Sequence, residues 1–192
     1  RFITFEGGEG AGKSTQLNRL RDALKQAGVD VVRTREPGGS PAAEEIRTML
    51  VSRETHCWAP ETELLLHCAA RFEHVASVVN PALMRGAWVV CDRFHDSTVA
   101  YQGYGHGLGT DMVDRLHQML FGAFQPDLTL ILDLPVDVGL ERTQVRGSSE
   151  DRYERMAIEF HERLRYGFLK IAEQNSDRCV VLDAAKDEDH VY

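Results

Sequence analysis

The sequence has no apolar run that approaches the length of a membrane span, and we expect no signal peptide before its first apolar segment. Positive charge is also scarce: 22 lysines and arginines against 30 aspartates and glutamates give a net charge of −8. This balance argues against nucleic acid as a partner, so any polyanion must bind in a local basic pocket. On these expectations we predict that the chain is cytoplasmic.

Metal-site and disulfide signatures are missing as well. The sequence contains no H-E-x-x-H segment and no C-x-x-C spacing among its four cysteines, Cys57, Cys68, Cys91 and Cys179. We therefore expect reduced cysteines that pack in the interior. No repeat or low-complexity segment divides the 192 residues, so we expect one domain over 1–192. The first apolar segment starts at the second residue, and we expect a few residues to precede it.

The most informative segment is 7–14, whose sequence GGEGAGKS fits the phosphate-loop pattern G-x-x-x-x-G-K-[ST]. An apolar strand precedes it, and apolar residues at helical spacing follow it as far as Gly28. The alternative is a tight strand-to-helix turn that carries lysine and serine by chance, but motif and context agree. We therefore expect a nucleoside triphosphate with Mg²⁺ on the Ser14 hydroxyl. The residues expected to hold the nucleotide are Gly7, Gly8, Glu9, Gly10, Ala11, Gly12, Lys13, Ser14 and Thr15.

Segments typical of strands and helices alternate along the chain, which indicates an α/β fold with a parallel sheet covered on both faces. The expected strands are 2–5, 29–34, 87–91, 127–133 and 179–183. Helices are expected after the phosphate loop and at 41–50, 60–85, 97–101, 111–121, 136–145 and 153–174. The glycine-dense segment 103–109 is expected to be flexible.

Four of these strands end in charged residues: Glu6, Arg35-Glu36, Asp92-Arg93 and Asp133. The carboxyl ends of parallel strands meet at one edge of a sheet, where ligands bind. The sequence therefore predicts a phosphate and metal site at this edge. Either Asp92 or Asp133 is expected to hold Mg²⁺ together with Ser14.

Phosphoryl transfer also requires cations besides the loop lysine, at both ends of the transferred group. Arginine suits this role because its planar guanidinium binds phosphate through two parallel hydrogen bonds. The candidates are Arg35, Arg47, Arg71, Arg93, Arg142, Arg146 and Arg152.

Several motifs occur in the order found in thymidylate kinases: FEGGEGAGKS at 5–14, TREPGG at 34–39, AAR at 69–71, DR at 92–93 with AYQG at 100–103, and PDLT at 126–129. The chain resembles the bacterial type of this family over essentially its whole length. The resemblance implies a P-loop nucleoside-monophosphate-kinase fold, with a five-stranded parallel sheet and a short arginine-bearing lid at about 146–152. It also implies transfer of the γ-phosphate of ATP to dTMP, which gives dTDP for dTTP biosynthesis, with Mg²⁺ as cofactor and a homodimer as the assembly.

The resemblance further implies roles for individual residues. The expected catalytic cations are Lys13, Arg93, Arg146 and Arg152, with Arg146 arriving from the lid on closure. The residues expected to bind dTMP are Glu9 near the deoxyribose, Glu36, Arg47 and Arg93 around the phosphate, and His67, Arg71, Thr98 and Gln102 at the base. Two positions depart from the family pattern: His67 replaces an aromatic ring that stacks on thymine, and His106 replaces an arginine before a glycine.

Three other functions are alternatives to a thymidylate kinase, and each makes a different demand on the sequence. Another monophosphate kinase or a deoxynucleoside kinase would share the phosphate chemistry and differ only in the base pocket. A GTP-dependent switch needs an N-K-x-D segment, which the sequence lacks. A non-catalytic ATP-binding protein would not need a second, arginine-rich site.

We expect the dimer to form through the helix at 60–85, because its apolar stripe is long for one covering helix; the alternative is that the whole stripe packs on the sheet.

Overall fold

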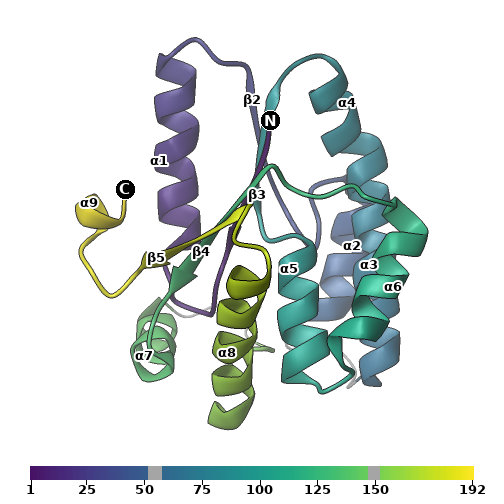
Figure 1. Cartoon of the computed structure of the whole chain (residues 1–192), viewed down its shortest axis with the longest axis vertical. Coiled ribbons are helices and arrows are strands. Elements are labelled where there is room, and N and C mark those ends of the chain that lie inside the picture. The colour runs from purple at the N-terminus through teal and green to yellow at the C-terminus, as the bar shows by residue number, and fades with distance from the viewer. Residues whose placement is uncertain (52–57, 147–151) are drawn as a thin grey trace.

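A computed structural model describes residues 1–51, 58–146 and 152–192, without the side chains of residues 145 and 146. In this part of the chain, five parallel strands form one sheet in the order β2-β3-β1-β4-β5 (Figure 1). The strands are β1 (Phe2–Glu6), β2 (Val31–Arg35), β3 (Trp88–Asp92), β4 (Leu128–Asp133) and β5 (Cys179–Asp183). The expected parallel α/β sheet is confirmed, with the first strand at its centre.

Residues of β1 alternate between two hydrophobic cores because successive side chains of a strand point to opposite faces. Ile3 and Phe5 pack in a core with Leu17 of the first helix. Phe2 faces the other side, where its ring lies edge-on to Phe94 at 4.9 Å between centroids. Both faces of the sheet are therefore buried, which explains why its strands read as continuous apolar runs.

Helices cover both faces of this sheet. Figure 1 shows α1 and α7 on one side and α3, α6 and α8 on the other. The helical elements are α1 (Lys13–Gln26), α2 (Pro41–Val51), α3 (Pro60–His74), η1 (Val75–Val79), α4 (Asn80–Met84), α5 (His95–Thr98), η2 (Val99–Gly105), α6 (Thr110–Phe121), α7 (Val136–Arg146), α8 (Ile158–Gln174) and α9 (Glu188–Val191). The two η segments are π-helical, and π-helical turns are frequent at functional sites. None of the described helices is both long and apolar enough to cross a membrane.

The expectation of a flexible segment at 103–109 is wrong for its first part. Gly103 and Gly105 lie inside η2, where both are buried. A Cβ atom at Gly105 would lie 2.6 Å from the ring of Phe160 in α8. Glycine serves close packing of η2 against α8 here, so it does not signal a loose loop.

Two helix boundaries also differ from the expectation. The helix expected from residue 153 begins at Ile158, and residues 152–155 form a turn instead. The expected helix at 60–85 is present, but η1 interrupts its α-helical hydrogen bonding. Of the cysteines, Cys68, Cys91 and Cys179 are free and buried as expected, and Cys57 lies outside the described residues.

Candidate active site

The phosphate loop connects β1 to α1 through glycines, two of which leave no room for a side chain. A Cβ at Gly7 would lie 2.4 Å from the carbonyl oxygen of Leu132, and one at Gly10 would lie 2.2 Å from that of Gly139. Gly12 has a φ of 83° and leads into α1, whose N-terminus has no side-chain cap. The amides of the first turn of α1 are therefore available to an anion, which is the arrangement that phosphate requires.

Lys13 lies beneath this loop. Its Nζ donates to the carbonyl oxygens of Gly7 at 3.1 Å and Gly8 at 2.8 Å, so the ammonium follows the curve of the loop. Burial, reinforced by the charge of Arg93, lowers the pKa of Lys13 to about 8. A phosphate bound at the loop would place negative charge beside Lys13 and favour its protonated form.

The two carboxylates considered for Mg²⁺ have different partners. Asp92 accepts a 2.9 Å hydrogen bond from the hydroxyl of Ser14, at the first turn of α1. Asp133 instead accepts two hydrogen bonds from Arg165, at 2.7 and 2.8 Å. Among the described residues no cluster of three or more His, Cys, Asp or Glu side chains could hold a metal ion. A hydroxyl with one carboxylate fits Mg²⁺, which keeps several waters and binds substrate phosphates.

Arg93 occupies the junction between β3 and α5 with a left-handed φ of 70°. Such a conformation costs a non-glycine residue about 1–3 kcal/mol and is typical of functional sites. It directs the guanidinium to the carbonyl oxygen of Gly7 at 3.0 Å, the hydroxyl of Ser97 at 3.1 Å and the carboxylate of Glu9 at 3.1 Å. Burial alone would raise the pKa of Glu9, but Arg93, Lys13 and the Tyr101 hydroxyl lower it to about 2.

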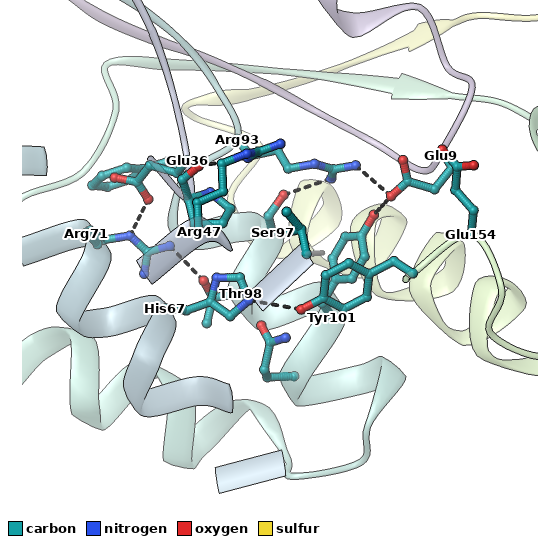
Figure 2. A pocket seen from close by; sticks show the side chains of 15 residues that line it. Glu9, Glu36, Arg47, His67, Arg71, Arg93, Ser97, Thr98, Tyr101 and Glu154 are labelled. Carbon is teal, nitrogen blue, oxygen red and sulfur yellow. Dashed lines mark hydrogen bonds and ion pairs between the residues drawn. The ribbon is translucent and has the colours of Figure 1, made fainter. Parts of the chain in front are cut away.

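A pocket lies beside the phosphate loop, between α3, α5 and η2. Figure 2 shows Arg71 and Glu9 on opposite sides of it, with Arg93 between them. The lining includes every residue expected to bind the acceptor, namely Glu9, Glu36, Arg47, His67, Arg71, Arg93, Thr98 and Gln102. Some of the lining also borders the groove over the phosphate loop: Glu9, Glu36, Arg47, Arg93 and Glu154. The pocket and the phosphate groove therefore adjoin, as sites for an acceptor and a donor must.

Arg71 is 2 % exposed and is held in place by two neighbours. Its Nε donates to Glu36 at 2.7 Å, and its Nη2 donates to Thr98 at 2.7 Å. His74 donates a second hydrogen bond to Glu36 at 2.8 Å, so both oxygens of this carboxylate accept from side chains of α3. Within the described part of the chain, Arg71 Nη1 has no hydrogen-bond partner, although it is buried.

Gln102 presents the complementary group from η2. Its Nε2 donates to Glu63 at 2.7 Å, and its Oε1 has no partner among the described residues, although the side chain is fully buried. An unpartnered buried polar atom costs about 1–3 kcal/mol. Two residues that line the pocket thus carry unsatisfied polar atoms, a donor on Arg71 and an acceptor on Gln102.

His67 lines the pocket and is fixed by Tyr153. The Tyr153 hydroxyl donates to Glu63 at 2.9 Å, so it accepts from His67 Nε2 at 3.1 Å. Burial lowers the pKa of His67 to about 4, and the ring is neutral near pH 7. A neutral ring with its Nε2 engaged remains able to contact a flat ligand.

Arg152 lies at this end of the pocket and not at the phosphate loop. Its Nη2 is ion-paired with Glu63, and its Nη1 donates to the carbonyl oxygen of Leu50 at 2.9 Å. Arg146 is the last residue of α7, and its side chain lies outside the described structure, as do residues 147–151 of the expected lid.

A further groove also borders the phosphate loop. Its lining includes Gly12, Thr15, Arg142, Ala184 and Lys186. Arg142 Nη1 lies 3.3 Å from the carbonyl oxygen of Ala184, which ties the end of β5 to α7. This groove extends the phosphate site toward the segment after β5.

Comparison with known proteins agrees with this geometry. The thymidylate kinase family model matches residues 5–192. The chain is 55% identical over 190 residues to a thymidylate kinase of Caulobacter vibrioides, and the match covers 99% of this chain and 91% of the relative. It is 50% identical over 187 residues to one of Geobacter sulfurreducens, covering 95% and 88%. The chain belongs to the thymidylate kinase family.

The solved structure of a thymidylate kinase from Ehrlichia chaffeensis has the same fold as this chain, with a TM-score of 0.79 and 39% sequence identity. The match covers 94% of this chain and 91% of the Ehrlichia chain. Thymidylate kinases transfer the γ-phosphate of ATP to dTMP and use Mg²⁺. The expectations of family, fold, reaction and cofactor are thus confirmed.

Three polar neighbours of the pocket were missed from the sequence: Glu63, His74 and Tyr153. Each contacts a residue that was expected to bind the acceptor, namely Gln102, Glu36 and His67 in turn. Glu63 and Tyr153 are 90 positions apart and meet only in the folded chain. No motif marks them, and only the helical spacing of Glu63, His67, Arg71 and His74 on α3 hinted at a shared polar face.

Proposed function

We propose that the pocket binds dTMP and recognises thymine through Arg71 and Gln102. The observation that carries the proposal is the pair of unsatisfied buried atoms, the donor Arg71 Nη1 and the acceptor Gln102 Oε1. Thymine offers an acceptor at O4 beside a donor at N3–H, which would satisfy both atoms. Cytosine reverses both groups and would leave each protein atom opposite a group of its own kind.

The acceptor phosphate would lie at the shared end of the pocket. Arg93 and Arg47 reach it from two elements, and both line the pocket and the phosphate groove. Glu9, held by Arg93 and by the Tyr101 hydroxyl, would meet the deoxyribose hydroxyl. Glu36 would act through Arg71, because its oxygens accept from Arg71 and His74.

The donor nucleotide would occupy the phosphate loop and the groove beyond it. The amides before α1 and Lys13 would hold the β- and γ-phosphates, and Ser14 with Asp92 would hold Mg²⁺ directly or through its waters. When bound, Mg²⁺ neutralises charge on the β- and γ-phosphate oxygens. The adenosine would lie toward Arg142 and Ala184.

The lid would supply the cation for the transferring phosphoryl group. Arg146 at the end of α7 is the first candidate, and Arg152 would support it from the turn at 152–155. Because Arg152 is ion-paired with Glu63, it fixes one end of the lid beside the acceptor pocket. Closure would then exclude water after both substrates bind.

We further propose a single-domain, cytoplasmic homodimer that pairs through α3 and α6. Large apolar side chains of these helices are exposed, with Phe72 and Leu65 on α3 and Met119 and Leu120 on α6. Phe72 lies 5.9 Å from Phe121 between ring centroids, so the two helices present one continuous apolar surface. Light scattering at micromolar concentration tests the dimer, which has twice the mass of the 21.6 kDa chain; a monomeric mass contradicts it.

Titration calorimetry of dTMP tests the base-recognition proposal. Gln102→Leu removes the acceptor and should weaken dTMP binding at least about tenfold, the effect of one hydrogen bond to a buried group. Gln26→Leu, on the exposed end of α1, is the matched control and should bind dTMP normally. Equal affinity of wild type and Gln102→Leu would remove Gln102 from the base site.

A further inference from the structure

Glu63 is a fully buried carboxylate of α3 that lines no part of the dTMP pocket, yet it contacts groups that do. Its Oε1 accepts from Gln102 Nε2 at 2.7 Å, from Tyr153 at 2.9 Å and from His106 Nε2 at 3.0 Å. Its Oε2 is paired with Arg152. Every partner that the structure gives this carboxylate therefore donates to it.

A carboxylate surrounded by donors remains ionised. Burial alone would raise the pKa of Glu63, but the hydrogen bond from His106 and the charge of Arg152 bring it well below the ordinary value. An ionised carboxylate only accepts hydrogen bonds. Gln102 must therefore turn its NH₂ group toward Glu63, because the reversed amide would place two oxygens in contact.

The orientation of the Gln102 amide also fixes the position of its oxygen. With Nε2 held by Glu63, Gln102 Oε1 is the atom left for the pocket, and it has no partner in the described residues. We propose that Glu63 is the positioning residue that sets base specificity, by forcing Gln102 to present an acceptor to N3–H of a thymine or uracil ring. The inference rests on the proposed function, since it assumes that the pocket holds a pyrimidine nucleotide.

Glu63→Gln separates this role from packing, because the new side chain has the same shape and can donate as well as accept. The Gln102 amide is then free to reverse and offer its NH₂ group to N3 of cytosine. The informative ligands are dUMP and dCMP, since they differ only at the N3 and position-4 groups and both lack the 5-methyl group.

The experiment measures the dissociation constants of dUMP and dCMP by calorimetry for wild type and Glu63→Gln. Wild type should prefer dUMP, and the variant should reduce the ratio of the two constants about tenfold or more, with tighter binding of dCMP in absolute terms. The dTMP-to-dUMP ratio should stay unchanged, because the methyl group is read elsewhere. A purely structural role would weaken both ligands alike and leave the dUMP-to-dCMP ratio intact, which would overturn the proposal.

His106→Gln is the matched control, because it changes another partner of Glu63 Oε1 without touching Gln102. It should keep the wild-type ratio, and a fall as large as that of Glu63→Gln would contradict the specific role of Glu63. If wild type itself does not distinguish dUMP from dCMP, the proposed pyrimidine site fails, and that result is separate from an unchanged ratio in Glu63→Gln.

A second measurement covers the case in which Glu63→Gln does not fold. Nuclear Overhauser spectra of wild type saturated with dUMP should connect the Gln102 side-chain NH₂ protons to the His106 ring, because both groups donate to Glu63 Oε1. Cross-peaks from these NH₂ protons to the N3–H proton of dUMP, without those to His106, would show the reversed amide and overturn the proposal.

Discussion

The hydroxyl of Ser14 donates a 2.9 Å hydrogen bond to Asp92, across 78 positions of sequence. This contact joins the first turn of α1 to the end of β3, at the edge where the phosphate loop lies. Asp133, the other carboxylate considered for Mg²⁺, is instead held by Arg165. The two aspartates therefore have different partners, and the metal dependence of their variants can separate their roles.

Asp92→Asn should raise the Mg²⁺ concentration needed for half-maximal turnover about tenfold or more, because the variant loses the charge that holds the ion or its waters. Asp133→Asn is the control and should leave this concentration close to that of wild type. Turnover measured against Mg²⁺ at fixed ATP decides between them. The reverse pattern would assign the metal to Asp133.

Lys13→Ala should remove most turnover while the fold stays intact, because the lost contact is to transferring phosphate. Removal of one preorganised charge contact raises the barrier by about 3–4 kcal/mol, or a factor of roughly 10²–10³ in kcat. Near-normal turnover in a folded Lys13→Ala protein contradicts the role of the phosphate loop.

The lowered pKa of Lys13 predicts a pH dependence of its own. Lys13 is charged below its pKa of about 8 and loses its proton as the pH rises through that value. In the free enzyme kcat/KM for ATP should therefore fall above about pH 8, since this parameter reports the unliganded protein. Lys13→Arg, which stays charged, should abolish the fall even if its overall rate is low. If kcat/KM of the wild type stays constant up to about pH 9.5, Lys13 does not control this pH dependence.

Arg146→Ala should lower kcat far more than it raises KM for dTMP, because a lid cation acts mainly on the transition state. Arg152→Ala should have the smaller effect on kcat, since Arg152 is ion-paired with Glu63 beside the acceptor pocket. Steady-state kinetics with varied dTMP separate the two parameters. If only KM changes in Arg146→Ala, that arginine belongs to the acceptor site and Arg152 becomes the first candidate.

His67 is expected to contact the thymine ring in place of an aromatic side chain. His67→Phe should keep or tighten dTMP binding, because a phenyl ring offers more area and is less hydrated than imidazole. His67→Ala should weaken binding about tenfold or more, the lower end of the 1–3 kcal/mol range for base stacking. Calorimetric titration of the three proteins decides, and equal affinities would remove His67 from the site.

The residues of the phosphate loop and the lining of the pocket could be named from the sequence, but the side chains that hold this lining in place could not, for a physical reason. Lys13 and Ser14 belong to a short local motif, and Arg93 follows a recognisable buried strand, so each could be placed without knowledge of tertiary contacts. The partners of Glu63 come from η2, the residue after it and the turn at 152–155, which only folding brings together. The glycines of 103–105 misled because packing against Phe160 and loop flexibility require the same residue type.

We propose that Arg71 Nη1 and Gln102 Oε1 select the pyrimidine edge of the phosphate acceptor. The most direct test is ADP release with ATP·Mg²⁺ against dTMP, dUMP, dCMP, dAMP and dGMP under identical conditions. We expect the highest kcat/KM for dTMP and a lower value for dUMP, with the values for dCMP and both purine nucleotides lower by at least two further orders of magnitude. Turnover of dCMP or a purine nucleotide at a rate comparable to that of dTMP would contradict this role of Arg71 and Gln102.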